Sequence, residues 1–113
     1  MKYKIIFTSG YVDDSDALMK GYKSDILLLD QENKYYQLNF IEIDVIRNKF
    51  DKSKLCFLES NMVTLHQITK DSILKCIADL HNCQFYKRWL PLKSNELEIF
   101  YPKEDWDVFE VEI

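Results

Sequence analysis

The apolar residues of this 113-residue chain occur only in short runs, and this pattern constrains its fold most strongly. The longest runs, such as residues 26–29, have four residues, whereas a membrane-spanning helix needs about 20. A secretory signal needs about 7–15 apolar residues, and the run nearest the N-terminus, residues 5–7, has three. We therefore expect a protein of the cytoplasm that makes no contact with a membrane.

Short runs of β-branched, aromatic and other apolar residues, separated by polar intervals, are typical of strands. The polar interval 30–34 has the length and composition of a hairpin loop. Residues 9–24, which hold both glycines, are predicted to form an irregular loop with at most a short helical turn near Ala17. Strands are expected at residues 2–8, 25–29, 35–40, 55–58, 62–66, 97–101 and 106–113.

Two segments have helical periodicity. Residues 42–50 form a short amphipathic pattern, and the clearer helix begins after Thr69 and ends near Asn82. Thr69 is a good N-cap, and Ile73, Cys76, Ile77 and Leu80 form one apolar stripe. At 113 residues the chain is expected to be a single domain. We predict a single α+β domain, mainly an antiparallel sheet with two helices packed on it.

Most chemistry-bearing motifs are missing from the sequence. With only Gly10 and Gly21, it contains neither of the glycine-rich loops that cradle phosphates. Cys76 and Cys83 are too far apart for a zinc-binding pair, and we expect both to be buried small hydrophobes beside a surface His81. Residues 13–16 lack the glycine and the distal glutamate of a calcium loop. No metal or cofactor is expected.

Two further functions are weakly supported. Residues 87–89, Lys-Arg-Trp, could stack on a nucleic-acid base, but they stand alone in a chain of net charge −4, so no nucleic-acid partner is expected. A small enzyme with Cys56, Cys76 or Cys83 as nucleophile is conceivable, although no local motif surrounds them. Three cysteines, an odd number, indicate reduced thiols.

The charge is unevenly distributed along the chain. Residues 1–93 carry 14 basic and 12 acidic side chains, whereas residues 94–113 carry one basic and seven acidic ones. Large aromatic residues are interleaved with these acids, which indicates a docking surface for a basic partner. The alternative is a solvated strand whose aromatic residues point inward. The candidate partner-binding residues are Asp13, Asp14, Asp16, Glu98, Tyr101, Glu104, Asp105, Trp106, Asp107 and Glu110.

The chain carries a recognisable pattern in two halves. In the first half, residues 25–30 and 35–40 are followed by a helical segment, and in the second half, residues 61–69 are followed by the apolar stripe at 73–80. In this it resembles the small immunity proteins of bacterial contact-dependent growth inhibition and related polymorphic toxin systems. The resemblance implies a cytoplasmic, non-enzymatic protein that binds a cognate toxin domain and blocks it. Toxins of these systems are commonly basic nucleases, which an acidic surface would fit. The second hypothesis is a structural or adaptor-type interaction domain, which could form homo-oligomers through exposed sheet edges.

Overall fold

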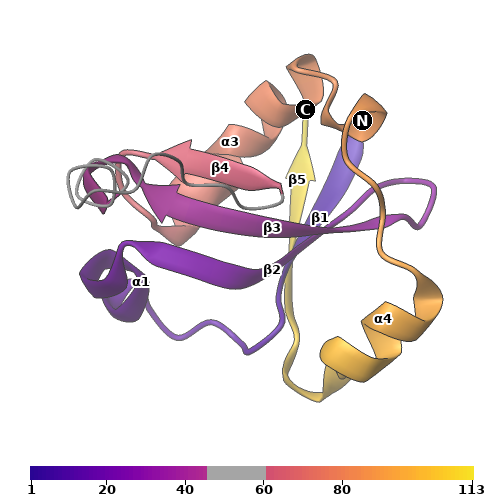
Figure 1. Ribbon diagram of the computed structural model, residues 1–113, viewed down its shortest axis with the longest axis horizontal. Coiled ribbons are helices and arrows are strands. Elements are labelled where there is room, and N and C mark those ends of the chain that lie inside the picture. Colours follow the sequence, from indigo (N-terminus) through magenta and orange to yellow (C-terminus); the bar gives the residue numbers. More distant parts are fainter. Residues whose placement is uncertain (46–60) are drawn as a thin grey trace, which may run out of the picture.

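The computed structural model describes residues 1–45 and 61–113, and its centre is a five-stranded sheet (Figure 1). The strands are β1 (Lys2–Phe7), β2 (Tyr22–Leu29), β3 (Tyr35–Glu42), β4 (Met62–Leu65) and β5 (Asp107–Glu112), in the spatial order β4-β3-β2-β1-β5. All neighbours are antiparallel except β3 and β4, which are parallel. The predicted α+β class is confirmed, with a sheet that is mostly antiparallel.

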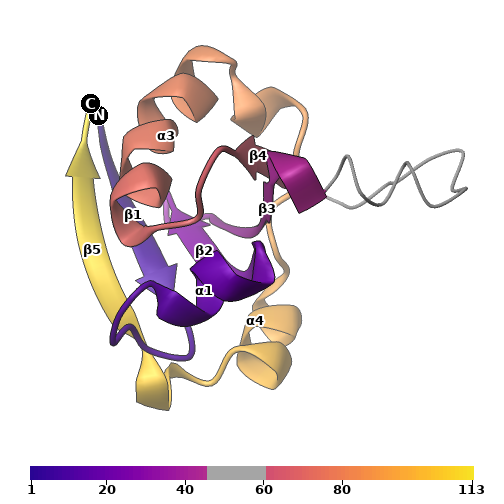
Figure 2. The ribbon, with the colours of Figure 1, turned by 90° about the vertical axis from the view of Figure 1, so that its left-hand side faces the viewer.

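Helices lie on both faces of the sheet and at one of its ends (Figures 1 and 2). They are α1 (Ser15–Lys20), α3 (Lys70–Asn82) and α4 (Ser94–Phe100), with 3-10 turns η1 (Phe85–Lys87) and η2 (Lys103–Asp105). Because successive side chains of a strand point to opposite faces of the sheet, two neighbouring residues of β3 distinguish these faces. Tyr36 packs edge-on against Phe85, just after α3, whereas Tyr35 lines a hollow beside α4. Along the lower edge of Figure 1, α1, the loop before it, η2 and α4 follow one another.

The main core lies between the sheet and α3. Every second residue of the central strands points into it, which is why Ile5, Phe7, Ile26 and Leu28 are fully buried. The α3 stripe supplies Ile73, Cys76 and Ile77, with Leu80 packed against its margin. The opposite face of the sheet also buries Ile6, Leu27 and Ile41, so both faces of the central strands are covered.

The helix predicted after Thr69 is confirmed, and its N-terminus is held by a reciprocal pair of hydrogen bonds. The Ser72 backbone N–H donates to Thr69 Oγ1 at 3.0 Å, and the Thr69 N–H donates to Ser72 Oγ at 2.9 Å. These bonds satisfy two of the donors that a helix start leaves free.

The strand predicted at residues 97–101 is wrong, because these residues belong to α4 and its C-cap. Leu97, Ile99 and Tyr101 alternate as in a strand, but the Glu96 carboxylate accepts a hydrogen bond from the Lys93 N–H at 3.2 Å and so caps a helix start. Leu97 and Tyr101, four residues apart, then share the face of α4 that lines a hollow beside β3.

The loop predicted at residues 9–24 is only partly correct. Its helical turn is α1, which begins at Ser15 rather than near Ala17, and β2 begins at Tyr22, earlier than predicted. Gly21, with φ 65°, makes the left-handed turn between them. Residues 43–45 are helical, but the rest of the helix predicted at 42–50 and the strand predicted at 55–58 lie outside the described residues.

Replacing Thr69 by Ala should lower the free energy of unfolding by about 1 kcal/mol, because the Ser72 N–H loses its acceptor. Urea denaturation followed by circular dichroism measures this loss. Thr69→Ser is the matched control, since it keeps a hydroxyl at the cap. Equal stability of the Ala and Ser variants would contradict the capping role.

Candidate functional site: an acidic rim and the hollow beside α4

Two of the segments that carry predicted site residues meet at one end of the sheet. We call residues 11–16 together with residues 104–107 the acidic rim. Antiparallel pairing of β1 with β5 places Phe7 opposite Asp107, so the loop that leaves β1 runs beside the start of β5. Gly10, with φ 81°, turns the chain there, and the Tyr11 N–H donates to Asp107 Oδ2 at 2.7 Å. This bond joins residues 96 positions apart.

Asp14 fastens the rim to α3. Its Oδ1 accepts a hydrogen bond from the Lys70 N–H at 2.8 Å. The Lys70 ammonium lies 3.8 Å from the centroid of the Phe109 ring and 5.2 Å from that of Tyr11, within cation–π range. Burial, and next Asp14, raise the pKa of the Tyr11 phenol. The Asp14 carboxylate therefore holds the rim against α3, and we do not count it among the acids that are free to contact a partner.

Asp13 and Asp16 are exposed at the start of α1. The Ser15 hydroxyl and N–H both donate to Asp13, and these bonds lower the pKa of its carboxyl group. Asp16 pairs with Lys20 at 3.2 Å, but both side chains are well exposed, so this pair contributes little stability. Asp13 is thus held ionised where a partner can reach it.

The C-terminal half of the rim combines exposed acids with one half-buried aromatic ring. Glu104 and Asp105 are exposed and have no hydrogen bond or ion pair with other described residues. The Trp106 ring is half-buried, 6.0 Å from that of Tyr35, and the Lys103 ammonium lies 5.5 Å from its centroid. Phe109 packs into the main core, so the inward alternative is correct for this aromatic residue.

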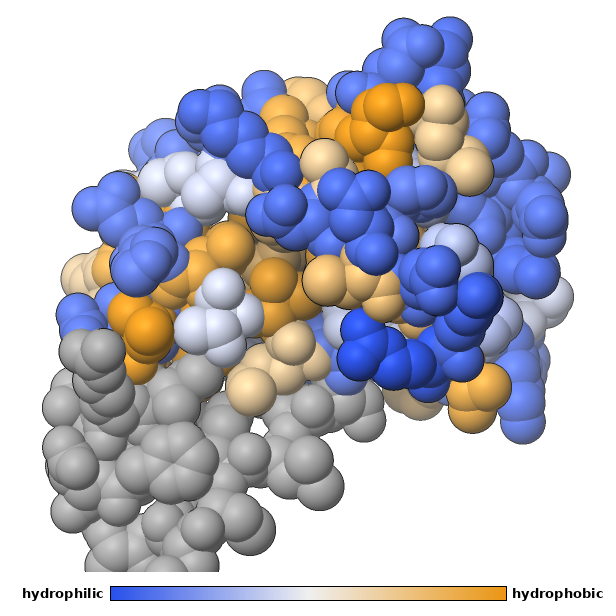
Figure 3. All heavy atoms as spheres, turned by 90° about the horizontal axis from the view of Figure 1, so that it is seen from above, coloured by the Kyte–Doolittle hydropathy of each residue, from blue (hydrophilic) through white to orange (hydrophobic). Residues whose placement is uncertain are grey.

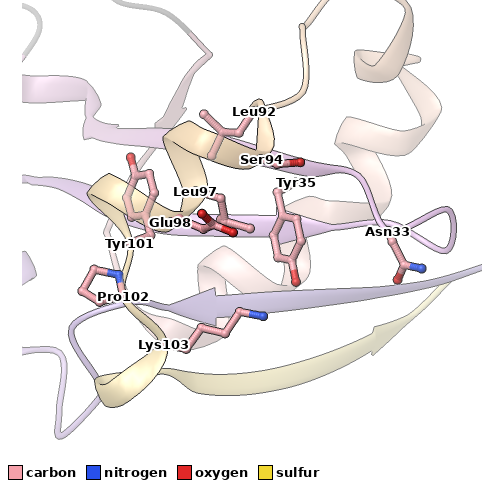
Figure 4. A pocket seen from close by; sticks show the side chains of 9 residues that line it. All are labelled: Asn33, Tyr35, Leu92, Ser94, Leu97, Glu98, Tyr101, Pro102 and Lys103. Atoms are coloured by element: carbon pink, nitrogen blue, oxygen red, sulfur yellow. The ribbon is translucent and has the colours of Figure 1, made fainter.

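Glu98 and Tyr101 lie beside the rim, in a hollow of about 460 Å³ between α4 and β3 (Figure 4). The side chains of Leu97 and Glu98 lie between the rings of Tyr101 and Tyr35. Burial first, and then the charges of nearby carboxylates, raise the pKa of Tyr101. The lining residues are Asn33, Tyr35, Leu92, Ser94, Leu97, Glu98, Tyr101, Pro102 and Lys103.

The structure separates Glu110 from the other candidates. It stands opposite Lys4 in the β1–β5 pairing and lines a different hollow, with Lys2 and Lys4. Three residues along a strand correspond to about 10 Å, so Glu110 lies well away from Asp107 at the rim. Sequence reasoning missed Tyr11 and Tyr35, because no local motif indicates that they reach β5 and Trp106.

Exposed apolar side chains flank these acids. Val12 is 93% and Met19 is 81% exposed beside Asp13 and Asp16, and Ile99 and Phe100 are 69% and 67% exposed on α4. Large apolar side chains in water next to charged ones are typical of surfaces that bind another protein.

Other kinds of site have less support in the described ranges. Residues 1–45 and 61–113 contain no group of three or more His, Cys, Asp or Glu side chains placed to hold a metal ion. Within the same ranges, no helix has the length and apolar character needed to cross a membrane. Cys76 is buried as expected, but Cys83 is exposed, contrary to expectation, and His81 is half-buried and bonded to Tyr3.

Comparison with protein-family models, curated proteins and solved structures found no significant match to this chain.

Removing the carboxylate with Asp107→Ala should loosen the rim, because the Tyr11 N–H then has no acceptor. We expect amide exchange at Tyr11 to accelerate by about tenfold or more, with about 1 kcal/mol lost in global stability. Hydrogen exchange followed by NMR measures both. Asp105→Ala is the control, since Asp105 accepts no such bond, and equal exchange rates in the two variants would contradict the link.

The two described cysteines should differ sharply in reactivity. Burial raises the pKa of the Cys76 thiol to about 12, so about one molecule in ten thousand carries the thiolate at pH 8. Iodoacetamide at that pH should label Cys83 quickly and Cys76 only after unfolding, and labelling of Cys76 should rise with pH. Rapid labelling of Cys76 at pH 7 would instead revive the hypothesis of a cysteine enzyme.

Proposed function

We propose that this chain is a non-enzymatic immunity protein, which binds and neutralises a cognate bacterial toxin domain of basic charge. The observation that carries the proposal is the Tyr11–Asp107 bond, which brings the two acidic segments of the chain together. A surface fixed before binding loses less conformational entropy when the partner docks. The family resemblance of the sequence supplies the class of partner, and the charge of the rim fits it.

The charges and the apolar residues of this surface would have separate roles. Glu104, Asp105 and Asp13 are exposed and would steer a cationic domain toward the rim, which raises the association rate. Phe100 and Ile99 on one side and Met19 on the other would then be buried in the complex and slow its dissociation. Inhibition in this scheme needs no chemistry, because covering the toxin's cationic substrate site is sufficient.

The test is co-expression with the toxic C-terminal domain of the protein encoded immediately upstream of this chain. We expect this chain to restore growth and to form a complex whose dissociation constant rises with salt. Failure to restore growth, or a neighbourhood of metabolic genes alone, would contradict the proposal.

A pair of matched variants locates the interface. Glu104→Gln with Asp105→Asn should weaken binding about tenfold at low salt, because two free rim charges are lost. Glu110→Gln with Glu112→Gln removes the same charge from the far end of β5 and should change binding by less than about twofold. Equal losses of affinity in both double variants would show that binding depends only on the net charge of the protein and not on the position of these acids.

The adaptor hypothesis has one observation in its favour, since β5 is an edge strand of the sheet. Two copies joined through this edge would bring together the acids Asp107, Glu110 and Glu112 of each strand, and like charges oppose such pairing. We therefore expect a monomer in sedimentation equilibrium at micromolar concentration. A dimer that forms when salt screens these like charges would favour the adaptor hypothesis instead.

A further inference from the structure

A second hollow lies at the end of the sheet opposite the acidic rim, where β1 begins and the β2–β3 loop turns. It encloses about 410 Å³. Three tyrosines from separate parts of the chain, Tyr3, Tyr36 and Tyr86, line it with Asp30 and Glu32 of the loop; Met1, Gln31 and Lys34 complete the lining. Figure 3 views the molecule from above Figure 1, and on this face apolar side chains lie among hydrophilic ones.

The hydroxyl of Tyr36 offers a ligand a hydrogen-bonding group in the wall of the hollow. Tyr36 is only 2% exposed, yet its hydroxyl has no hydrogen-bond partner in the described ranges and faces the hollow. Tyr3 differs, since its hydroxyl bonds to His81 Nδ1 at 2.7 Å. The hydroxyl itself still reaches solvent, since among the described residues only the Trp106 indole N–H is a fully buried side-chain polar group without a partner. A bound molecule with a donor would take the place of water at the Tyr36 hydroxyl.

Asp30 supplies the negative charge of the hollow and is held rigidly. One carboxylate oxygen accepts the Glu32 and Lys34 N–H groups, each at 2.9 Å. After burial, the charge of Asp30 is the largest cause of the raised pKa of both Tyr3 and Tyr36, so its field reaches both phenols.

The other charged groups around the hollow already have partners. Glu32 and Lys34 form an exposed ion pair at 3.2 Å, and the Met1 amino group donates to the Ile113 carbonyl at 3.2 Å. Asp30 forms no ion pair with a described residue, so its carboxylate is open to a cationic ligand.

Tyr86 gives the hollow an aromatic wall at its mouth. It is 42% exposed, and its ring is fixed by an edge-on contact with Phe85 at 5.6 Å and a tilted one with His81 at 5.9 Å. A flat cation can stack on such a ring while its edge reaches oxygen acceptors.

We propose that this hollow is a binding site for a guanidinium group, the side chain of an arginine in a peptide or protein ligand. The planar group would place its N–H donors toward Asp30 and the Tyr36 hydroxyl and stack on Tyr86. Guanidinium fits better than ammonium, because it offers five donors in one plane and sheds its hydration more readily. The site lies apart from the acidic rim, so it does not depend on the proposed function.

The test is an NMR titration with Nα-acetyl-arginine amide, with Nα-acetyl-citrulline amide as the neutral isostere. We expect saturable shifts confined to residues 1–3, 30–36 and 86 at millimolar concentration, and none with the citrulline compound. Asp30→Asn keeps an oxygen for the two loop N–H groups and should weaken binding fivefold or more. Tyr36→Phe should weaken it about threefold.

The control is Glu112→Gln, which removes one charge outside the hollow and should leave binding unchanged. No saturation by about 20 mM, equal shifts with citrulline, or undiminished binding by both Asp30→Asn and Tyr36→Phe would each overturn the proposal. If Asp30→Asn fails to fold, the affinity of Tyr36→Phe for the arginine compound decides the test, since this substitution removes only one oxygen.

Discussion

The pairing of the last strand with the first is the constraint on which the other features depend. Because β5 lies antiparallel to β1, residue Asp107 comes to stand opposite Phe7, and the loop after β1 meets the acidic C-terminal segment. At the other end, Ile113 and Met1 exchange two backbone hydrogen bonds. The rim and the tyrosine hollow are thus fixed at opposite ends of one strand, with Tyr3 and Phe7 about 13 Å apart.

Elements set by local patterns could be predicted from the sequence. The helix after Thr69 has its cap and its stripe within a dozen residues, and β1, β3 and β5 have clear strand composition. The segment 97–101 could not be assigned in this way. Its alternation of Leu97, Ile99 and Tyr101 fits a strand, and only the Glu96 cap and packing beside β3 make it helical. Local capping and tertiary packing together override the strand-like alternation here.

The candidate site was only partly accessible to sequence reasoning. Counting charges located the acidic C-terminal segment. Closeness in sequence grouped Glu110 with Asp107, and strand geometry places the two residues apart along β5. The contact of Tyr11 with Asp107 depends on strand pairing across 96 residues, which no local pattern encodes. The tyrosine hollow had no sequence signal either, because its rings come from β1, β3 and the segment after α3.

Hydrogen exchange of the complex with its toxin domain, compared with the free protein, tests most directly whether the acidic rim is the docking surface. The account predicts slower exchange in residues 9–16 and 96–107, with little change in residues 110–112 at the far end of β5. Protection confined to β5 beyond Asp107, or to the hairpin loop at 30–34, with unchanged exchange at the rim, would contradict it.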